Sequence, residues 1–209
     1  MIKIAVFTGT RAEYGLMKTL IRKLIKSSYF ELQLIVSSTH LESSFGNTIK
    51  EIENDGIIPS YILPIEIDPS REYYMNFQTA ETIKGVTIAL EKLKSKYLVV
   101  LGDRYESFAA AIAANLMRIE IIHLHGGETT LGALDNKLRH SISQLSNWHF
   151  TSSDIPKQNI TYPPAPVLQA PPQRHLQGNL NNPHGLSDLE IAIQLSQQQT
   201  HQNHLPPAQ

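Results

Sequence analysis

The 209-residue sequence contains no cysteine, which excludes disulfide bonds and thiolate metal sites. Its formal net charge is only -1, so it lacks the basic excess that a nucleic-acid-binding protein uses to neutralise phosphates. No apolar run approaches the roughly 18 residues of a membrane-spanning helix, and the amino terminus turns polar too early for a secretory signal. These absences predict a cytoplasmic protein with neither a membrane nor a nucleic acid as its partner.

Charged and aromatic residues are also scarce after Ser153, whereas proline and glutamine are enriched there. Nine of the twelve prolines follow Ser153, and the chain reaches Gln197-Gln198-Gln199 near its end. A segment of this composition cannot bury enough apolar surface to offset the entropy lost on ordering. We therefore predict a folded domain over residues 1–153 and a disordered, low-complexity Pro/Gln-rich tail over 154–209.

Strand-like and helix-like patterns alternate through the first 153 residues. Strands are expected at 2–7, 31–36, 97–101, 119–124 and 148–151, with an irregular or edge strand at 57–65, where prolines intervene. Helices are expected from Gly15 onward and near 45–56, 72–93, 105–117 and 136–145. This alternation predicts an α/β fold with a Rossmann-like parallel sheet. The expected core is Ile4, Val6, Leu34, Val36, Leu98, Val100, Ile112, Ile121 and Leu124.

Polar and titratable residues follow several of these strands. In a parallel sheet every strand-to-helix loop lies at the carboxyl edge, so residues far apart in sequence share one crevice there. The residues expected at this edge are Arg11, Asp103, Arg104, His123, His125, Glu128 and Asp135. Several titratable groups in one crevice favour acid/base chemistry.

Each of these residues also has a purely structural interpretation. The loop from Gly9 to Gly15 opens a helix, and with Arg11 it suits an anion, but Arg11 can equally be a solvated loop residue. Asp103 can act as a base, or it can cap the following helix and pair with Arg104. His123 lies inside an apolar run, which favours a hydrogen-bonded core histidine.

The later residues divide in the same way. His125 precedes Gly126-Gly127, which let the backbone turn and a ligand approach, so a functional role is favoured. Glu128 can bond the turn or face the crevice. Asp135 can be a catalytic carboxylate or a helix cap.

Four motifs in order resemble the hydrolysing UDP-N-acetylglucosamine 2-epimerases. They are Gly9–Gly15, Leu101–Glu106, His123–Thr129 and Asp135–Ser141. That family supplies N-acetylmannosamine or a close analogue for sialic or legionaminic acid synthesis. The resemblance implies a GT-B architecture of two Rossmann-like domains, and this chain resembles the amino-terminal one.

The resemblance also implies a reaction. UDP leaves the anomeric carbon as the neighbouring carbon loses its proton, and water then adds to the glycal to release the epimerised sugar. No metal or other cofactor is implied, and the partners are a UDP-sugar and, in a homodimer, a second copy. The implied catalytic residues are Asp103, His125, Glu128 and Asp135. The implied substrate-binding residues are Gly9, Arg11, Arg104, Arg139 and His140.

Beyond Ser153 the sequence no longer resembles that family. A frameshifted or prematurely ended gene explains this break, and a divergent natural tail is the alternative. A chain without the second domain is expected to be impaired or inactive, which leaves a non-catalytic half-domain or weak nucleotide-sugar binder as another interpretation. A third is a metal-dependent phosphoesterase, from Gly102-Asp103 and the nearby histidine-glycine-glutamate cluster. That class needs an Asp/His pair where the first strand ends, and this sequence has Thr8-Gly9-Thr10-Arg11.

Overall fold

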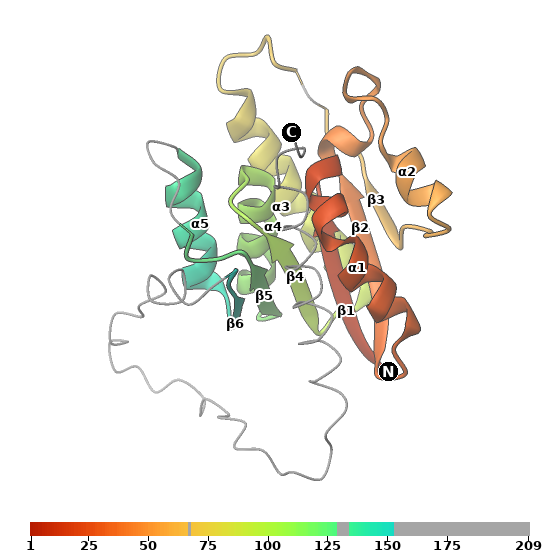
Figure 1. Ribbon diagram of the computed structural model, residues 1–209. Helices are drawn as coiled ribbons and strands as arrows, with labels where there is room; N and C mark the ends of the chain where they lie inside the picture. The colour runs from red at the N-terminus through yellow and green to blue at the C-terminus, as the bar shows by residue number, and fades with distance from the viewer. Residues whose placement is uncertain (67, 129–133, 153–209) are drawn as a thin grey trace, which may run out of the picture.

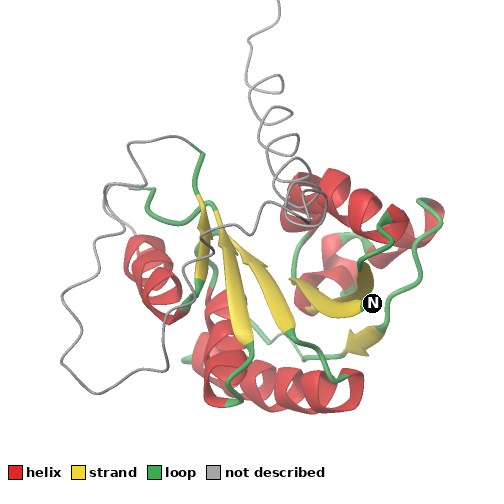
Figure 2. Cartoon of the chain, turned by 90° about the horizontal axis from the view of Figure 1, so that it is seen from below, coloured by secondary structure: helices red, strands yellow, loops and turns green. Residues whose placement is uncertain are grey.

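The structure is a computed structural model that describes residues 1–66, 68–128 and 134–152. The predicted tail and Thr129 of the third motif lie outside these residues. The described part is built around one six-stranded sheet with helices on both faces (Figures 1 and 2).

All neighbouring strands of the sheet are parallel, in the order β3-β2-β1-β4-β5-β6. The strands are β1 (Ile2–Thr8), β2 (Phe30–Ser37), β3 (Tyr61–Leu63), β4 (Tyr97–Leu101), β5 (Glu120–Leu124) and β6 (Trp148–Phe150). This is the Rossmann strand order, which confirms the predicted fold class. The proline-interrupted segment forms the short edge strand β3, as expected.

Two helices pack on one face of the sheet and three on the other. The first face carries α1 (Arg11–Lys26) and α2 (Ile49–Asn54). The second carries α3 (Tyr74–Leu93), α4 (Tyr105–Leu116) and α5 (Leu134–Leu145). Two single-turn 3-10 helices, Ser38–His40 and Ser43–Phe45, connect β2 to α2. None of the helices in these described ranges is long and apolar enough to cross a membrane.

The alternating residues of each strand divide the core into two layers. Val6 and Leu34 pack beneath α1, whereas Leu98 and Ile121 pack against the opposite helices. The predicted core is confirmed except at Ile112, which is only half-buried. The small side chains of the alanine run, around Ala110 and Ala113, form the buried face of α4, and at 100° per residue Ile112 points away from it.

The expected start of the first helix is wrong. α1 begins at Arg11 rather than near Gly15, because Thr10 caps it. The Thr10 Oγ1 accepts from the Glu13 N–H at 3.3 Å, and the Glu13 carboxylate accepts from the Thr10 N–H at 3.0 Å. This reciprocal capping box ends the loop immediately after β1.

The strand order reverses direction between β1 and β4. β2 and β3 extend from β1 on one side, while β5 and β6 extend from β4 on the other. In folds of this kind ligands bind at such a switch point, outside the carboxyl ends of the strands. The candidate residues after β1, β4 and β5 all lie at that edge.

Candidate functional site

Four of the predicted residues form one hydrogen-bonded group, which we call the Arg139 network: Asp103, His125, Glu128 and Arg139. Asp103 follows β4, His125 and Glu128 follow β5, and Arg139 comes from α5. Arg139 donates to the Asp103 carboxylate through Nη2 and to Glu128 Oε2 through Nη1, at 2.8 Å for the latter. The Nδ1 of His125 lies 2.9 Å from Glu128 Oε1. The parallel pairing of β4 with β5 brings these residues together.

The contacts within the Arg139 network shift the pKa of Glu128. Burial by itself would raise the pKa of Glu128, but the hydrogen bonds from His125 and Ser152 and the charge of Arg139 lower that pKa to about 2. Arg139 is only 9% exposed and contacts two carboxylates. These contacts hold the Glu128 carboxylate in its charged form.

A tight turn carries His125 into the network. His125 has a left-handed backbone, with φ of 59°, and so has Gly127, with φ of 74°. A side chain at Gly126 would place its Cβ 2.8 Å from His123 Nδ1 and 2.9 Å from Ser143 Oγ. The two glycines therefore allow a turn in which β5 passes directly against α5.

His123 is the hydrogen-bonded core histidine that the sequence predicts. It is fully buried, with Nε2 lying 2.7 Å from the Gly102 carbonyl and Nδ1 3.1 Å from Ser143 Oγ. Burial lowers its pKa to about 4. A neutral His123 therefore links the turn after β4 to α5 beneath the Arg139 network.

A cleft of about 420 Å³ opens at the switch point, where α1 and α4 begin. Arg11 and Arg104 line it from the starts of α1 and α4, together with Tyr105. The remaining lining residues are Thr10, Ala12, Thr39, Phe45, Thr48, Pro69 and Tyr74. Two guanidinium groups and the amino terminus of α1 make the cleft suited to an anion.

The two cleft arginines differ in how they are held. The Arg11 side chain is 70% exposed, and its Nε donates to Glu51 at 2.6 Å. Arg104 donates from Nε and Nη2 to the buried carboxylate of Glu106, at 3.2 and 2.8 Å. Burial would lower the pKa of Arg104, but its hydrogen bond with Glu106 and the Glu106 charge outweigh that effect and raise it.

This pairing excludes the structural interpretation of Asp103 as a cap that pairs with Arg104. Asp103 contacts Arg139 instead, and Arg104 occupies the cap position of α4 without a side-chain capping bond. The phosphoesterase interpretation would use Asp103 and Glu128 as metal ligands. In this structure Arg139 occupies the position between them.

The other predicted site residues lie outside both groups. Gly9 is buried, and its N–H already donates to Glu13 at 2.7 Å. Asp135 is exposed in the first turn of α5, and His140 is half-buried on the same helix. Asp135 is not a cap that precedes the helix, because α5 begins at Leu134.

Two buried carboxylates, Glu13 and Glu106, were not predicted as site residues from the sequence, and we call them the carboxylate pair. Glu13 Oε2 accepts from the backbone N–H groups of Gly9 and Thr10, and Oε1 accepts from Ser107 Oγ at 2.9 Å. Burial raises the pKa of Glu13 to about 7, and the Glu106 charge contributes. The Thr10-x-x-Glu13 spacing is the available sequence signal for the first of them. Glu106 ends the Leu101–Glu106 motif, but no local spacing marks it for burial.

The segment after β2 also reaches the cleft. Thr39 Oγ1 donates to the Gly9 carbonyl at 2.9 Å. The buried His40 bridges Thr8 and Thr48 through its two ring nitrogens, at 3.0 and 2.8 Å. Burial lowers the pKa of His40 to about 4, so a neutral imidazole fixes this wall of the cleft.

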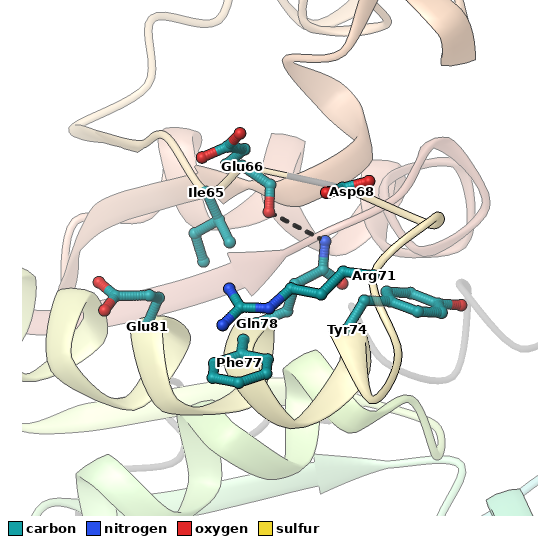
Figure 3. Close-up of a pocket in the computed structure, with 8 residues that line it drawn as sticks. All are labelled: Ile65, Glu66, Asp68, Arg71, Tyr74, Phe77, Gln78 and Glu81. Atoms are coloured by element: carbon teal, nitrogen blue, oxygen red, sulfur yellow. Dashed lines mark hydrogen bonds between the residues drawn. The ribbon is translucent and has the colours of Figure 1, made fainter.

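A second, smaller cavity of about 140 Å³ lies beyond Tyr74, which lines both cavities (Figure 3). There the Arg71 guanidinium lies over the Phe77 ring at 3.3 Å, and Gln78 Nε2 donates to the Glu66 carbonyl at 3.2 Å. None of the residues proposed from the sequence lines this cavity. Across the described residues there is no cluster of three or more His, Asp or Glu side chains arranged to hold a metal ion.

Comparison with known proteins identifies the family of this chain. A family model described as UDP-N-acetylglucosamine 2-epimerase matches residues 22–163. The chain belongs to this family. The match extends past Ser153, where the composition of the chain changes.

Similar curated proteins include two bacterial epimerases. The chain is 37% identical over 158 residues to a UDP-N,N'-diacetylbacillosamine 2-epimerase (hydrolyzing) of Legionella pneumophila. It is 38% identical over 158 residues to a GDP/UDP-N,N'-diacetylbacillosamine 2-epimerase (hydrolyzing) of Campylobacter jejuni. These alignments cover 76% of this chain but 42% and 41% of the relatives, so the chain spans under half their length.

Solved structures of the family share the fold. The Neisseria meningitidis UDP-GlcNAc 2-epimerase, solved with UDP-GlcNAc bound, superposes with a TM-score of 0.67 at 27% identity. A putative epimerase from Listeria monocytogenes gives a TM-score of 0.68 at 22% identity. The matches cover 77% and 76% of this chain and 42% and 41% of those chains. This agrees with the predicted α/β half of a GT-B fold.

Proposed function

We propose that the described domain supplies the proton-transfer and diphosphate-binding groups of a hydrolysing UDP-sugar 2-epimerase. The substrate would be UDP-N-acetylglucosamine or a related UDP-sugar. The products would be UDP and the free sugar epimerised at C2. Both relatives named above as hydrolyzing epimerases support this reaction class.

One juxtaposition carries the proposal. Asp103 and Arg104 are consecutive residues after β4, yet Asp103 belongs to the Arg139 network and Arg104 lines the cleft. A UDP-sugar whose diphosphate lies against Arg104 and Arg11 would therefore bring its sugar ring close to Asp103. Cations at the leaving group and a base near the adjacent carbon are what elimination of UDP requires.

The proposed reaction has two balanced steps. In the first, a carboxylate, for which we propose Asp103, removes the C2 proton while the C1–O bond breaks and UDP leaves with the bonding electrons, which gives the glycal. In the second, water adds its oxygen to C1, and C2 is protonated on the opposite face. His125, Glu128 and Asp135 are the proposed groups for the remaining proton transfers. Gly9, Arg139 and His140 remain predicted substrate-binding residues.

Turnover by the purified chain tests the proposal directly. The chain is incubated with UDP-N-acetylglucosamine or UDP-N,N'-diacetylbacillosamine in D₂O, and UDP release and the sugar product are followed by NMR. We expect UDP release with deuterium incorporated at C2 of the product. We expect Asp103→Asn and Asp135→Asn to lose turnover while the fold survives. The exposed Asp68→Asn is the matched control and should retain it.

The alternative function is a non-catalytic UDP-sugar binder, because the chain spans under half of its relatives' length. UDP binding without any UDP release at high protein concentration would support this alternative. Absence of both binding and release would contradict both functions. Wild-type rates in Asp103→Asn would contradict the role proposed for that carboxylate.

A cytoplasmic location, a homodimeric state and the origin of the 154–209 segment remain predictions. Gel filtration tests the oligomeric state. The DNA downstream of the gene tests the frameshift hypothesis, which predicts that a second, family-like domain is encoded there in another reading frame.

A further inference from the structure

Glu106 is a buried carboxylate that no step of the proposed reaction uses. Its side chain is 1% exposed, although it lies in the first turn of α4, next to the cleft-lining Tyr105. It accepts from Arg104 through both carboxylate oxygens, with Nη2 to Oε1 at 2.8 Å and Nε to Oε2 at 3.2 Å. Ser38 Oγ also donates to Oε1, at 3.2 Å. Both oxygens of Glu106 are therefore satisfied.

This two-point pairing fixes the plane of the Arg104 guanidinium. A free arginine side chain loses rotamer entropy when it binds a ligand, whereas one that is already oriented loses less. The pairing uses two of the five guanidinium N–H donors. Because the Arg104 side chain is 42% exposed and lines the cleft, the remaining donors are available to an anion there.

The arrangement is costly for the fold alone. Glu106 adds a second buried carboxylate close to Glu13, and its charge helps to raise the pKa of Glu13. Arg104 is the cation that faces both carboxylates. A buried ion pair stabilises a protein weakly compared with apolar packing. Fold stability alone therefore does not explain why Glu106 is buried, and we look for the explanation in its contact with Arg104.

We propose that Glu106 is a positioning residue that holds the Arg104 guanidinium ready for the diphosphate of the UDP-sugar. This inference rests on the proposed function and extends it, since it assigns the buried carboxylate to ground-state binding of the leaving group. The two cleft arginines then differ in how far they are oriented before the ligand binds. Arg104 is held by a buried carboxylate, whereas the carboxylate partner of Arg11, Glu51, is itself half-exposed.

A double-mutant cycle with UDP as the probe tests the coupling. Calorimetry would measure UDP affinity in the wild type, Glu106→Gln, Arg104→Met and the double variant. A charge-assisted hydrogen bond is worth enough to predict about a tenfold loss for Glu106→Gln. The double variant should bind no more weakly than Arg104→Met, because Glu106 acts through Arg104. Additive losses, or wild-type affinity in Glu106→Gln, would overturn the proposal. The exposed Glu81→Gln is the matched control.

Two further measurements keep the outcome decisive. If Glu106→Gln does not fold, Arg104→Lys keeps the charge but cannot make the two-point pairing, and unchanged UDP affinity in that variant would contradict the proposal. If the wild type neither binds UDP nor releases it from the UDP-sugar, the proposed function is wrong for this chain. The exchange rate of the Arg104 Nε–H, followed by ¹⁵N NMR, then decides the positioning. We expect slow exchange in wild type and Glu81→Gln and fast exchange in Glu106→Gln, and equal rates would overturn it.

Discussion

The two groups of charged residues at the carboxyl edge of the sheet have similar chemistry but opposite electrostatics. In the carboxylate pair, burial raises the pKa of Glu13 to about 7. In the Arg139 network, hydrogen bonds and the Arg139 charge outweigh burial and lower the pKa of Glu128 to about 2. Both groups lie at the ends of neighbouring strands of one sheet.

The placement of the cation in each group explains this difference. Arg139 lies between two carboxylates and contacts both of them. Arg104 contacts Glu106 and reaches Glu13 only through its field. A buried carboxylate without a directly bonded cation is more easily protonated. Glu128 is thus held in the ionised state, whereas Glu13 can exchange a proton near neutral pH.

The largest expected effect comes from removing the central cation of the Arg139 network. Arg139→Met leaves Asp103 and Glu128 partly buried without their partner, and we expect the free energy of unfolding to fall by about 4 kcal/mol. Urea denaturation measures this loss. Adding Glu128→Gln to Arg139→Met should recover part of this loss. If Arg139→Met lowered the free energy of unfolding no more than Arg11→Met does, the Arg139 network would not stabilise the fold as proposed.

A substitution in the turn that carries His125 should lower the free energy of unfolding nearly as much. Gly126→Ala places a Cβ within 3 Å of His123 and Ser143, and such overpacking should lower the free energy of unfolding by about 2 to 3 kcal/mol. Gly15→Ala, in the open part of α1, is the control. It meets nothing within 4 Å and should raise stability by about 0.5 to 1 kcal/mol. The same urea series compares them, and equal behaviour of the two variants would count against the turn geometry.

On the other side of the site, Glu13→Gln should stabilise the protein in a pH-dependent way. Because the folded-state pKa of Glu13 lies above its usual value of 4.5, the folded protein holds a proton that the unfolded chain loses. Wild-type stability therefore falls as the pH rises from about 4.5 to 7. Glutamine cannot ionise, its amide oxygen can accept from Gly9 and Thr10, and its amide nitrogen can donate to Ser107 Oγ in place of accepting from it. We therefore expect a gain of about 2 kcal/mol at pH 8 and little change at pH 4.5.

Unfolding by urea at several pH values measures this difference, with Glu81→Gln as the surface control. A gain independent of pH would show that packing rather than ionisation causes the effect.

The smallest expected effect on stability is that of Arg11→Met. Its ion pair with Glu51 is exposed, and exposed pairs contribute about 0.5 kcal/mol. We expect a small change in the thermal unfolding midpoint but a clear loss of UDP affinity, since Arg11 lines the cleft. If Arg11→Met caused a large loss of stability and left UDP affinity unchanged, Arg11 would stabilise the fold, as proposed for Arg139, and would not bind the ligand.

Local sequence signals were sufficient for most of the fold. The apolar runs predict each strand and the periodic residues predict each helix, with Tyr97–Leu101 matching β4 at both ends. The start of α1 was missed because a capping box, rather than apolar periodicity, sets it. Ile112 was misplaced because the small side chains of the alanine run, rather than the largest apolar residue, form the buried face of α4.

The candidate site was less accessible to sequence reasoning. The glycine-rich motifs point to Asp103, His125 and Glu128, because each follows a buried strand. Arg139 came only from the family resemblance and was expected to bind substrate, whereas in the structure it pairs two carboxylates. Glu106 was not proposed as a site residue, because a carboxylate in the first turn of a helix is favourable there without any buried partner.

The sequence by itself determined the alternation of strands and helices, the parallel sheet and the edge at which polar residues gather. These follow from apolar periodicity and from the geometry of strand-to-helix connections, which are local properties of the chain. Only the tertiary structure decided which cation pairs with which carboxylate, as with Arg139 and Asp103 across 36 residues of sequence. Ionic partners are chosen by distance and burial, which depend on how separate elements pack and therefore leave no pattern within any single segment.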